Sequence, residues 1–479
     1  MSDARDGAGP GPGASPGGPA AGRPDTGGPG AGQPNAGRPG EAGAAARAGS
    51  PLRPGVGRRE VWSWAMYDFA NSGYTTVVLT TVFNAYFVGV VAAGKSWGTL
   101  ALTAALSLSY LVVMLSMPGL GARADARAGH RRLLFASTAG CVLATAMLAS
   151  VAPGDIVWGL LWLALSNVCY CIGESAVASF LPGLARPEAM GRVSGWGWSF
   201  GYFGGMLALG LALWVAAAAE SGGLPAQAYV PWIMGLTAVL FAAAALPAFL
   251  WLREPATGAG RPPVAMLAQL RAAWRETRRD FPDFRRLLLC IACYQAGIAV
   301  VITLSAVYAT EVMGFGMQQT MLLVFLVNIG AAVGAFGFGY LQDRIGHRKA
   351  LALTLLGWIA MVLLAASARS LPLFWSAAAL AGLCMGTSQS AGRAMVGVLA
   401  PASRPAEFFA LWTFAVQLAA VVGPLSYGVL VWATAGNHRA ALLATGLFFL
   451  AGLALLGRLD FARGIRARDE PGHRSVPAD

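Results

Sequence analysis

The stretch Gly339-Tyr-Leu-Gln-Asp343-Arg344-Ile-Gly346-His-Arg348-Lys349 lies between two long apolar runs, and a related stretch lies 218 positions earlier. The earlier stretch reads Gly121-Ala-Arg-Ala-Asp125-Ala-Arg-Ala-Gly129-His-Arg131-Arg132. Each is a tight turn with a carboxylate and a basic cluster, at the same place within a series of six apolar segments. We expect two gating loops that lock one conformation, since their aspartates can accept bonds from arginine or from a helix N-terminus.

Hydrophobic residues make up 56% of the 479-residue chain, and charged residues only 12%. Apolar runs of about 20 residues, each enough to cross roughly 30 Å of hydrocarbon, recur along the sequence. We expect twelve transmembrane helices, near 62–90, 97–118, 133–152, 156–181, 194–219, 230–252, 286–309, 319–341, 350–368, 371–395, 407–433 and 440–458. A duplicated membrane bundle with a charged loop in each half is typical of a secondary transporter.

The net charge of +12 reflects membrane topology and does not indicate a nucleic-acid partner. All but three of the 34 basic residues fall on one side of the predicted membrane, and the exceptions are Lys95, Arg369 and Arg439. Basic residues accumulate on the cytoplasmic side of membrane proteins. We therefore expect both termini in the cytoplasm and the helices in the cytoplasmic (inner) membrane, with lipid as a partner.

The predicted segments divide the chain into five parts. Residues 1–58 are rich in Gly, Pro and Ala and predict a disordered cytoplasmic tail without a cleavable signal peptide. Two pseudo-symmetric six-helix bundles of an all-α membrane protein are expected over 59–253 and 286–459. Residues 254–285 predict a cytoplasmic linker in which Leu267, Leu270 and Trp274 give an amphipathic helix along the inner membrane surface. Residues 460–479 form a second cytoplasmic tail.

Ionisable side chains inside the predicted helices are the main functional signal, because each costs about 3 kcal/mol unless it is paired or hydrated. Asp68 follows Tyr67 and shares a helix face with Asn71, and Glu174 lies at a similar expected depth. Adding the 218-residue offset to Glu174 gives a position next to Arg393. We expect these residues to line a water-filled cavity that binds a proton, a charged substrate group, or both. The alternative is that Glu174 and Arg393 are structural ion-pairing residues at helix ends.

Further polar and aromatic residues lie near the expected midplane: Trp198, Tyr202, Gln295, Asn328, Gln389 and Gln417. For any single amide, an interhelical hydrogen bond of about 0.6 kcal/mol is the favoured explanation. As a set they are candidate cavity lining. Small-residue stripes at Gly197, Gly201 and Gly205, and at Gly330 and Gly334, predict close helix packing or a sliding surface between the halves.

No catalytic or metal-binding motif is recognisable. Cys290 and Cys293 have CxxC spacing without a second ligand pair, and the four histidines fall in loops or in the tail. We expect no cofactor, and a membrane enzyme or sensor is the disfavoured alternative of a different class.

The two loops, 121–132 and 339–349, resemble the repeated loop motif of the major facilitator superfamily. Within it, Trp64-Ala-Met-Tyr67-Asp68-Phe-Ala-Asn71-Ser72-Gly73-Tyr74 resembles the signature that opens the vacuole effluxer (autophagy-related amino-acid permease) family. Gly191-Arg-Val-Ser194-Gly-Trp-Gly197 and Gln389-Ser-Ala-Gly-Arg393 are similar to further motifs of that family. The chain departs from the family at Ala296, where members often carry an acidic residue.

The resemblance implies twelve helices in two halves, alternating access, and contact between the fifth and eighth helices. It also implies export of small polar solutes, with amino acids as the substrates of the fungal members. We therefore expect a monomeric secondary active transporter of an amino-acid-like solute, with the proton as the candidate coupling ion. A multidrug or sugar-type facilitator is the alternative, and the fifth helix lacks the Gly-Pro pattern common in drug/proton antiporters.

Overall fold

The computed structural model describes residues 50–93, 95, 97–255, 266–315 and 317–469. They belong to the compact unit Ser50–Asp479, and residues 1–49 of the tail predicted over 1–58 lie outside the described residues. Within this part of the chain the secondary structure is helical, apart from one isolated bridge between Leu52 and Ala185. That bridge orders residues 51–53, for which the sequence analysis predicts disorder.

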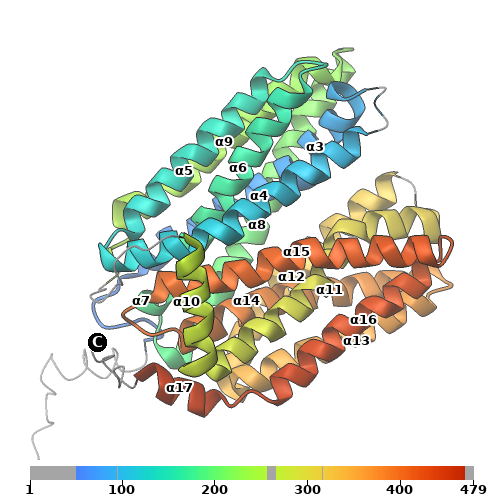
Figure 1. Ribbon diagram of the computed structural model, residues 1–479. Helices are drawn as coiled ribbons and strands as arrows, with labels where there is room; N and C mark the ends of the chain where they lie inside the picture. Colours follow the sequence, from blue (N-terminus) through green and yellow to red (C-terminus); the bar gives the residue numbers. More distant parts are fainter. Residues whose placement is uncertain (1–49, 94, 96, 256–265, 316, 470–479) are drawn as a thin grey trace, which may run out of the picture. The chain divides into compact units, whose positions relative to one another are not determined.

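The helices in chain order (Figure 1) are α2 (Arg58–Tyr74), η1 (Thr75–Thr80), α3 (Val82–Tyr86), η2 (Phe87–Val91), α4 (Gly98–Ala126), α5 (His130–Met147), η3 (Leu148–Ser150), α6 (Ile156–Ala178), α7 (Leu181–Leu184), η4 (Pro187–Ala189), α8 (Met190–Ser221), α9 (Ala226–Trp251), α10 (Met266–Arg279), α11 (Pro282–Met313), α12 (Met317–Ile345), α13 (His347–Ser367), α14 (Leu371–Leu399), α15 (Pro405–Ala433), α16 (His438–Gly457) and α17 (Phe461–Asp469). Twelve helical segments of the described chain are long and apolar enough to cross a membrane, and each overlaps one predicted segment. The predicted count and class are confirmed.

The first span, Arg58–Val91, is interrupted near its middle. The β-branched run from Thr75 winds as a wide π-helical turn, and Thr81 leaves the helical region with φ −124° and ψ −85°. Carbonyls freed by such a break must be satisfied within the protein, because lipid offers no donor. The hydroxyls of Thr80 and Thr81 both donate to the carbonyl of Thr76, at 2.9 and 2.5 Å. The threonines that disfavour the helix therefore also stabilise its interruption.

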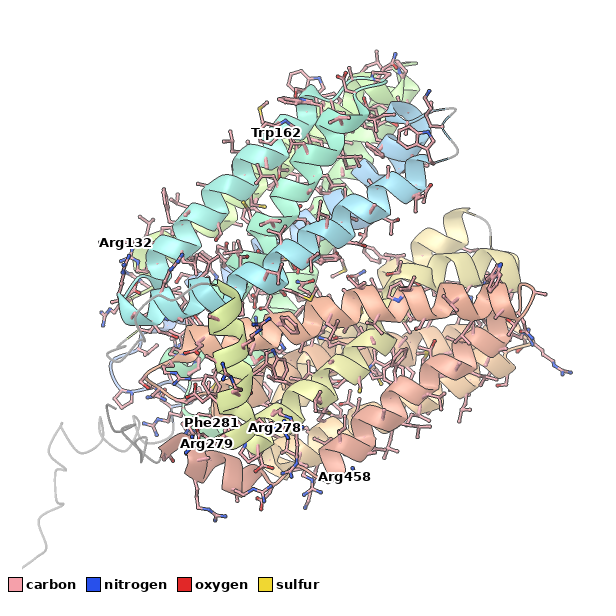
Figure 2. The ribbon with its side chains drawn as sticks, viewed as in Figure 1. Arg132, Trp162, Arg278, Arg279, Phe281 and Arg458 are labelled. Atoms are coloured by element: carbon pink, nitrogen blue, oxygen red, sulfur yellow. The ribbon has the colours of Figure 1, made fainter. Side chains whose placement is uncertain are left out.

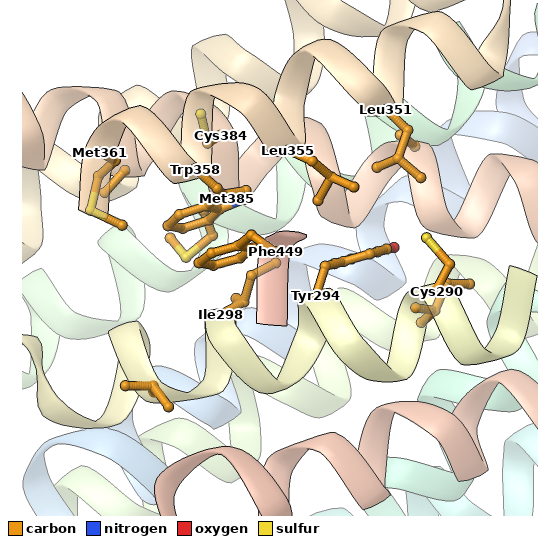
Figure 3. Close-up of a cluster of buried hydrophobic side chains, with 14 of the residues drawn as sticks. Cys290, Tyr294, Ile298, Leu351, Leu355, Trp358, Met361, Cys384, Met385 and Phe449 are labelled. Atoms are coloured by element: carbon orange, nitrogen blue, oxygen red, sulfur yellow. The ribbon is translucent and has the colours of Figure 1, made fainter. Parts of the chain in front are cut away.

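The twelve spans form two bundles, each with its own apolar core. One core is made by α2, α4, α5, α6, α8 and α9, and the other by α11 to α16. In the second, the buried indole of Trp358 stacks on Phe449 with ring centroids 5.1 Å apart and an interplanar angle of 3° (Figure 3).

The two bundles touch through α8 with α12 and α14, and through α4 with α15. Gly195 in α8 faces α12 so closely that a Cβ there would overlap the carbonyl of Ala335. The predicted stripe from Gly197 instead faces α2 inside its own bundle, and Gly334 faces α14. Positions 195 and 197 differ by about 200° around a helix, so the contact of α8 with α12 lies on the opposite side of α8 from the predicted stripe.

Two shorter helices lie at the end of the bundles that carries the two loops, here called the loop end. α10 contacts α4 of one bundle and α11 of the other. Its Trp274 packs edge-on against Phe414 of α15, with centroids 5.8 Å apart. The apolar face predicted to rest on the membrane thus packs on protein at this residue; the side chains of Leu267 and Leu270 lie outside what the structure describes. α17 packs on the ends of α11 and α14.

Candidate functional site

An ion pair between the bundles lies in the part nearer the loop end. Nη1 of Arg393, in α14, donates to Oδ2 of Asp68, in α2, at 2.7 Å. Asp68 is 7% exposed and Arg393 2%. Removing one member of such a buried pair costs about 3–5 kcal/mol, because the other charge is left uncompensated. This contact therefore favours a closed arrangement of the two halves at this depth.

The guanidinium of Arg393 is held by groups of the first bundle, across the interface from its own helix. Its Nη2 donates to the carbonyl of Ser194 at 2.9 Å and its Nε to the Ser194 hydroxyl at 3.2 Å. That hydroxyl in turn donates to the carbonyl of Ser390 at 2.9 Å. The cation also lies 4.6 Å from the ring of Trp64 and 5.3 Å from that of Trp198. Such cation–π contacts compensate part of the lost hydration.

Gly197 explains how three helices approach this pair. A Cβ at this position would collide with the Asp68 carboxylate and lie 2.6 Å from both Arg393 Nη2 and the ring of Trp64. The glycine leaves the space that the ion pair occupies. The glycine stripe therefore allows α8 to pack closely on α2 and, at Gly197, leaves room for the ion pair.

Glu174, in α6, lies close enough to Asp68 and Arg393 to interact electrostatically with both. Its side chain contacts that of Tyr170 and, unlike the ion pair, is partly exposed. Trp198 is also partly exposed although it contacts Arg393 of the other half. Both side chains thus keep some exposed surface beside the buried ion pair.

Three other predicted residues on the first and fifth spans lie beside this group. Tyr67 is buried and hydrogen-bonds Thr138 at 2.7 Å inside its own bundle, so its geometry is that of a packing residue. Asn71 is buried, and its Oδ1 has no hydrogen-bond partner in the described structure. Tyr202 lies 6.0 Å from the ring of Trp198.

The amides of the second bundle are not one cluster. Gln295 donates to Gln389 at 2.7 Å and joins α11 to α14. Gln417 reaches across to the sulfur of Cys171, at 3.2 Å. Asn328 donates to a carbonyl of its own helix at 2.8 Å, and this bond does not bring it to the others. The cysteines are free thiols, and the described residues contain no group of three or more His, Cys, Asp or Glu side chains that could hold a metal.

Each loop aspartate caps a helix of the other bundle. The carboxylate of Asp125 accepts the backbone N–H groups of Ala406 at 3.1 Å and Glu407 at 2.8 Å, at the start of α15. The carboxylate of Asp343 accepts those of Gly191 at 2.9 Å and Arg192 at 3.1 Å, at the start of α8. A carboxylate is stabilised at a helix N-terminus, where N–H groups lack partners. The two caps are related by the internal repeat.

The basic residues of the loops divide into two kinds. Arg131 donates to the carbonyl of Phe249 at 2.5 Å, and Arg348 to that of Gly457 at 2.6 Å, so each contacts the end of the last span of its own bundle. Arg132 and Arg344 are exposed. Gly121 and Gly339 are packed against the other bundle, at Ala406 and Gly191 respectively.

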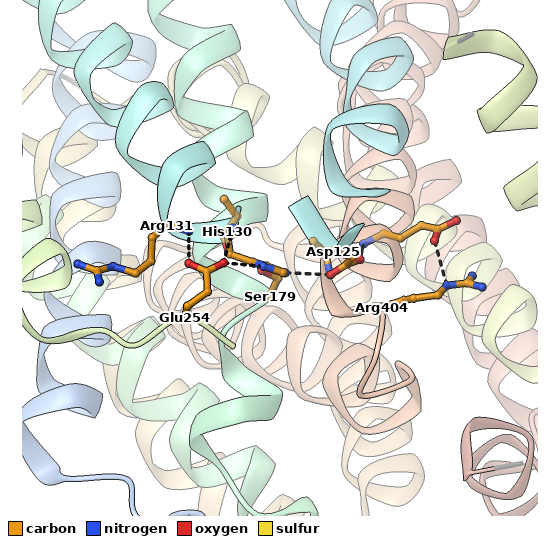
Figure 4. Close-up of polar contacts among 9 residues, drawn as sticks. Asp125, His130, Arg131, Ser179, Glu254 and Arg404 are labelled. Atoms are coloured by element: carbon orange, nitrogen blue, oxygen red, sulfur yellow. Dashed lines mark hydrogen bonds and ion pairs between the residues drawn. The ribbon is translucent and has the colours of Figure 1, made fainter. Parts of the chain in front are cut away.

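The structure adds two residues that the sequence analysis does not single out. His130 is fully buried between Asp125, 2.9 Å from Nε2, and Glu254, 3.1 Å from Nδ1 (Figure 4). Glu254 also accepts the backbone N–H groups of His130 and Arg131. The repeated dipeptide Gly-His, at 129–130 and 346–347, is the sequence signal that could have identified the histidine.

The opposite end of the bundles is open between α4 and α15. A cleft of about 530 Å³ is lined there by Thr103 and Ser107 of α4 and by Pro424 and Trp432 of α15, among others. The hydrogen bonds between bundles described above lie at the loop end or near the middle of the helices. The structure is thus closed at the loop end and open at the other.

Comparison with known proteins agrees with this architecture. The human organic anion transporter MFSD10 (TETRAN) has a similar solved structure, with a TM-score of 0.69 at 16% identity, over 83% of this chain and 99% of that one. The uncharacterized MFS-type transporter YxiO of Bacillus subtilis (strain 168) is 24% identical over 82% of this chain and 93% of its own. The fold and the paired loops define an integral membrane transporter of the major facilitator superfamily.

Within that superfamily, a family model described as "Vacuole effluxer Atg22 like" matches residues 85–469, and the chain belongs to this family. Autophagy-related protein 22 of Cryptococcus neoformans var. neoformans serotype D (strain JEC21 / ATCC MYA-565) is 25% identical over 59% of this chain and 53% of its own length. Both findings agree with the predicted family.

Proposed function

We propose that this transporter exports a small, polar, amino-acid-like solute across the cytoplasmic membrane by alternating access, acting as a monomer. The single observation that carries the proposal is the buried ion pair between Asp68 and Arg393, which joins the halves beside the partly exposed Glu174. Asp68 and Glu174 are the groups through which a proton would couple to transport. The excess of basic residues at the loop end supports a cytoplasmic position for that end and for both termini.

The ion pair gives a physical reason to favour a solute that carries both charges. The halves separate at the loop end only if Arg393 and Asp68 part, and each then loses its compensating charge. A zwitterion supplies a carboxylate for Arg393 and an ammonium group for Asp68 or Glu174. Such a solute lowers the barrier to opening, whereas a neutral sugar or an apolar cation compensates at most one of the two charges.

The test is counterflow of labelled amino acids in proteoliposomes, with and without a pH gradient. We expect Asp68→Asn, Glu174→Gln and Arg393→Gln each to lower counterflow at least about tenfold, as expected when about 1.4 kcal/mol of a required charge interaction is lost. Glu220→Gln is the matched control, because this carboxylate is exposed and bonds only Tyr229 among the contacts described.

A panel of sugars and lipophilic cations in the same vesicles addresses the alternative. If these compounds exchange while amino acids do not, the proposed substrate class is wrong. If Asp68→Asn and Glu174→Gln both retain normal, pH-dependent exchange, the proposed role of the carboxylates is wrong.

A further inference from the structure

The inner face of α10 is built into the contact between the bundles. Ala273 and Thr277 are buried, and Trp274 packs on Phe414 of α15. Glu276 forms an ion pair with Arg404 at 2.8 Å, and Arg404 pairs with Glu407 at 3.0 Å. The backbone N–H of Glu407 is one of the two that Asp125 caps.

The contact of Trp274 with Phe414 shows where α10 lies along α15. Phe414 is nine residues inside α15, which begins at Pro405, and this corresponds to about 13 Å along the helix axis. The 29 residues of α15 span about 43 Å, close to the thickness of a bilayer with its headgroups. The hydrocarbon core takes about 30 Å of this length, so Phe414 lies inside it, and Trp274 reaches inward from α10, which rests on the loop-end part of the bundles.

The outer face of α10 carries a row of exposed arginines. Arg271, Arg275 and Arg278 follow each other at i, i+4 and i+7 and so share one side of the helix. Arg279 lies beside them, and its pair with Asp280 is long, at 3.7 Å, and exposed. Figure 2 shows Arg278 and Arg279 at the end of α10 near Phe281, far from Arg132 of the first bundle. Three cations are thus held in line on the face of α10 that turns away from the bundles.

We propose that this arginine row is a binding site for anionic lipid headgroups, and that an occupied site stabilises the form closed at the loop end. The headgroups neutralise the row on the outer face of α10. The inner face holds Arg404 and, through Glu407, the helix start that Asp125 caps. When the loop end opens, α4 and α15 separate and α10 can no longer contact both. A lipid that holds α10 in its present position therefore favours the closed form. This inference is independent of the transported solute.

The experiment uses the full chain in nanodiscs of phosphatidylcholine, with or without about 30 mol% phosphatidylglycerol. Native mass spectrometry measures retained phosphatidylglycerol, and spin labels at the exposed positions Arg132 and Lys349 report the distance between bundles at the loop end. In the unsubstituted protein we expect phosphatidylglycerol to be retained and to enlarge the short-distance population. In Arg271→Gln/Arg275→Gln/Arg278→Gln we expect retention to fall at least about tenfold, because each arginine near an anionic surface contributes about a fivefold factor.

Two further variants make the result specific. Replacing the same three residues by lysine keeps the charge and should restore retention. Arg58→Gln/Arg59→Gln/Arg458→Gln removes three exposed charges at the same end, outside α10, and should change retention less than about twofold. The inference is overturned if the glutamine variant of α10 retains phosphatidylglycerol normally, or if this control loses as much. It is also overturned if removing phosphatidylglycerol leaves the distances unchanged. Neither readout requires transport, so its failure is distinct from failure of the proposed substrate class.

Discussion

Replacing the loop aspartates by asparagine should open the loop end. Asp125 accepts two backbone N–H groups of α15, at 2.8 and 3.1 Å, and Asp343 accepts two of α8, at 2.9 and 3.1 Å. Hydrogen bonds to a charged group contribute about 1.5–3 kcal/mol each. Asparagine keeps one neutral acceptor oxygen in the same volume. We therefore expect each substitution to remove about 2 kcal/mol from the closed form, roughly a 30-fold change in its equilibrium with the open form.

The assay is the distance distribution between spin labels at Arg132 and Lys349, in a background without the six native cysteines. The unsubstituted protein should show mainly the short distance of the closed loop end, and Asp125→Asn or Asp343→Asn should add a longer one. Asp280→Asn is the control. This carboxylate lies at the same end and is 54% exposed, and its ion pair with Arg279 is long, at 3.7 Å. Distributions in both variants that match the Asp280→Asn control would show that the caps do not hold the loop end closed.

Three further predictions concern packing and charge. Gly195→Ala should disfavour the closed loop end by about 1–3 kcal/mol, because the added Cβ would overlap a carbonyl of α12. The same distance assay checks this. Gly210→Ala is the control and should leave the distances unchanged, because the space around Gly210 is open. Trp358→Ala should lower the free energy of unfolding by about 3–5 kcal/mol in detergent melts, since it empties a stacked core position; an equal loss in Trp232→Ala, which is 77% exposed, would contradict this. Burial alone would lower the pKa of Arg404, but its bonds to two glutamates outweigh burial and raise the pKa above its usual value. A raised pKa gives stability that is lost only as pH rises through it, so the contact of α10 with Arg404 should persist as the pH is raised from neutral to about 10. A label on α10 that becomes mobile in this titration would refute it.

The apolar segments could be predicted because length and hydrophobicity decide whether a helix crosses a membrane. The ends of the helices could be predicted less closely, because several helices here continue into polar turns. α4, for example, runs through Asp125 to Ala126 before the loop begins. The interruption of the first span after Thr75 was not predicted. Hydropathy measures only how apolar a segment is, and it does not show which threonine hydroxyls donate to the carbonyls that the interruption leaves without a partner.

The pairing of Asp68 with Arg393 could be approached from the sequence, because the cost of buried charge indicated that both need compensation and the repeat offset applied to Glu174 led to Arg393. The sequence could predict that the loop aspartates bond arginine or a helix N-terminus, but not which helix. Every residue except proline has a backbone N–H group, so the sequence does not mark the partners. Of the two explanations left open for the Gly197 stripe, the structure agrees with close helix packing, here on α2, because spacing defines a face but not its neighbour. For the same reason, the amphipathic pattern of the linker could not tell whether Trp274 packs on lipid or on protein.

The exchange of caps between halves has a consequence for a chain cut within the 256–265 segment. Each fragment would keep its own aspartate but lose the acceptor for the start of one of its own spans, α8 in the first piece and α15 in the second. Two separately produced pieces should therefore recognise one another in the bilayer, because only the complementary fragment supplies the missing carboxylate.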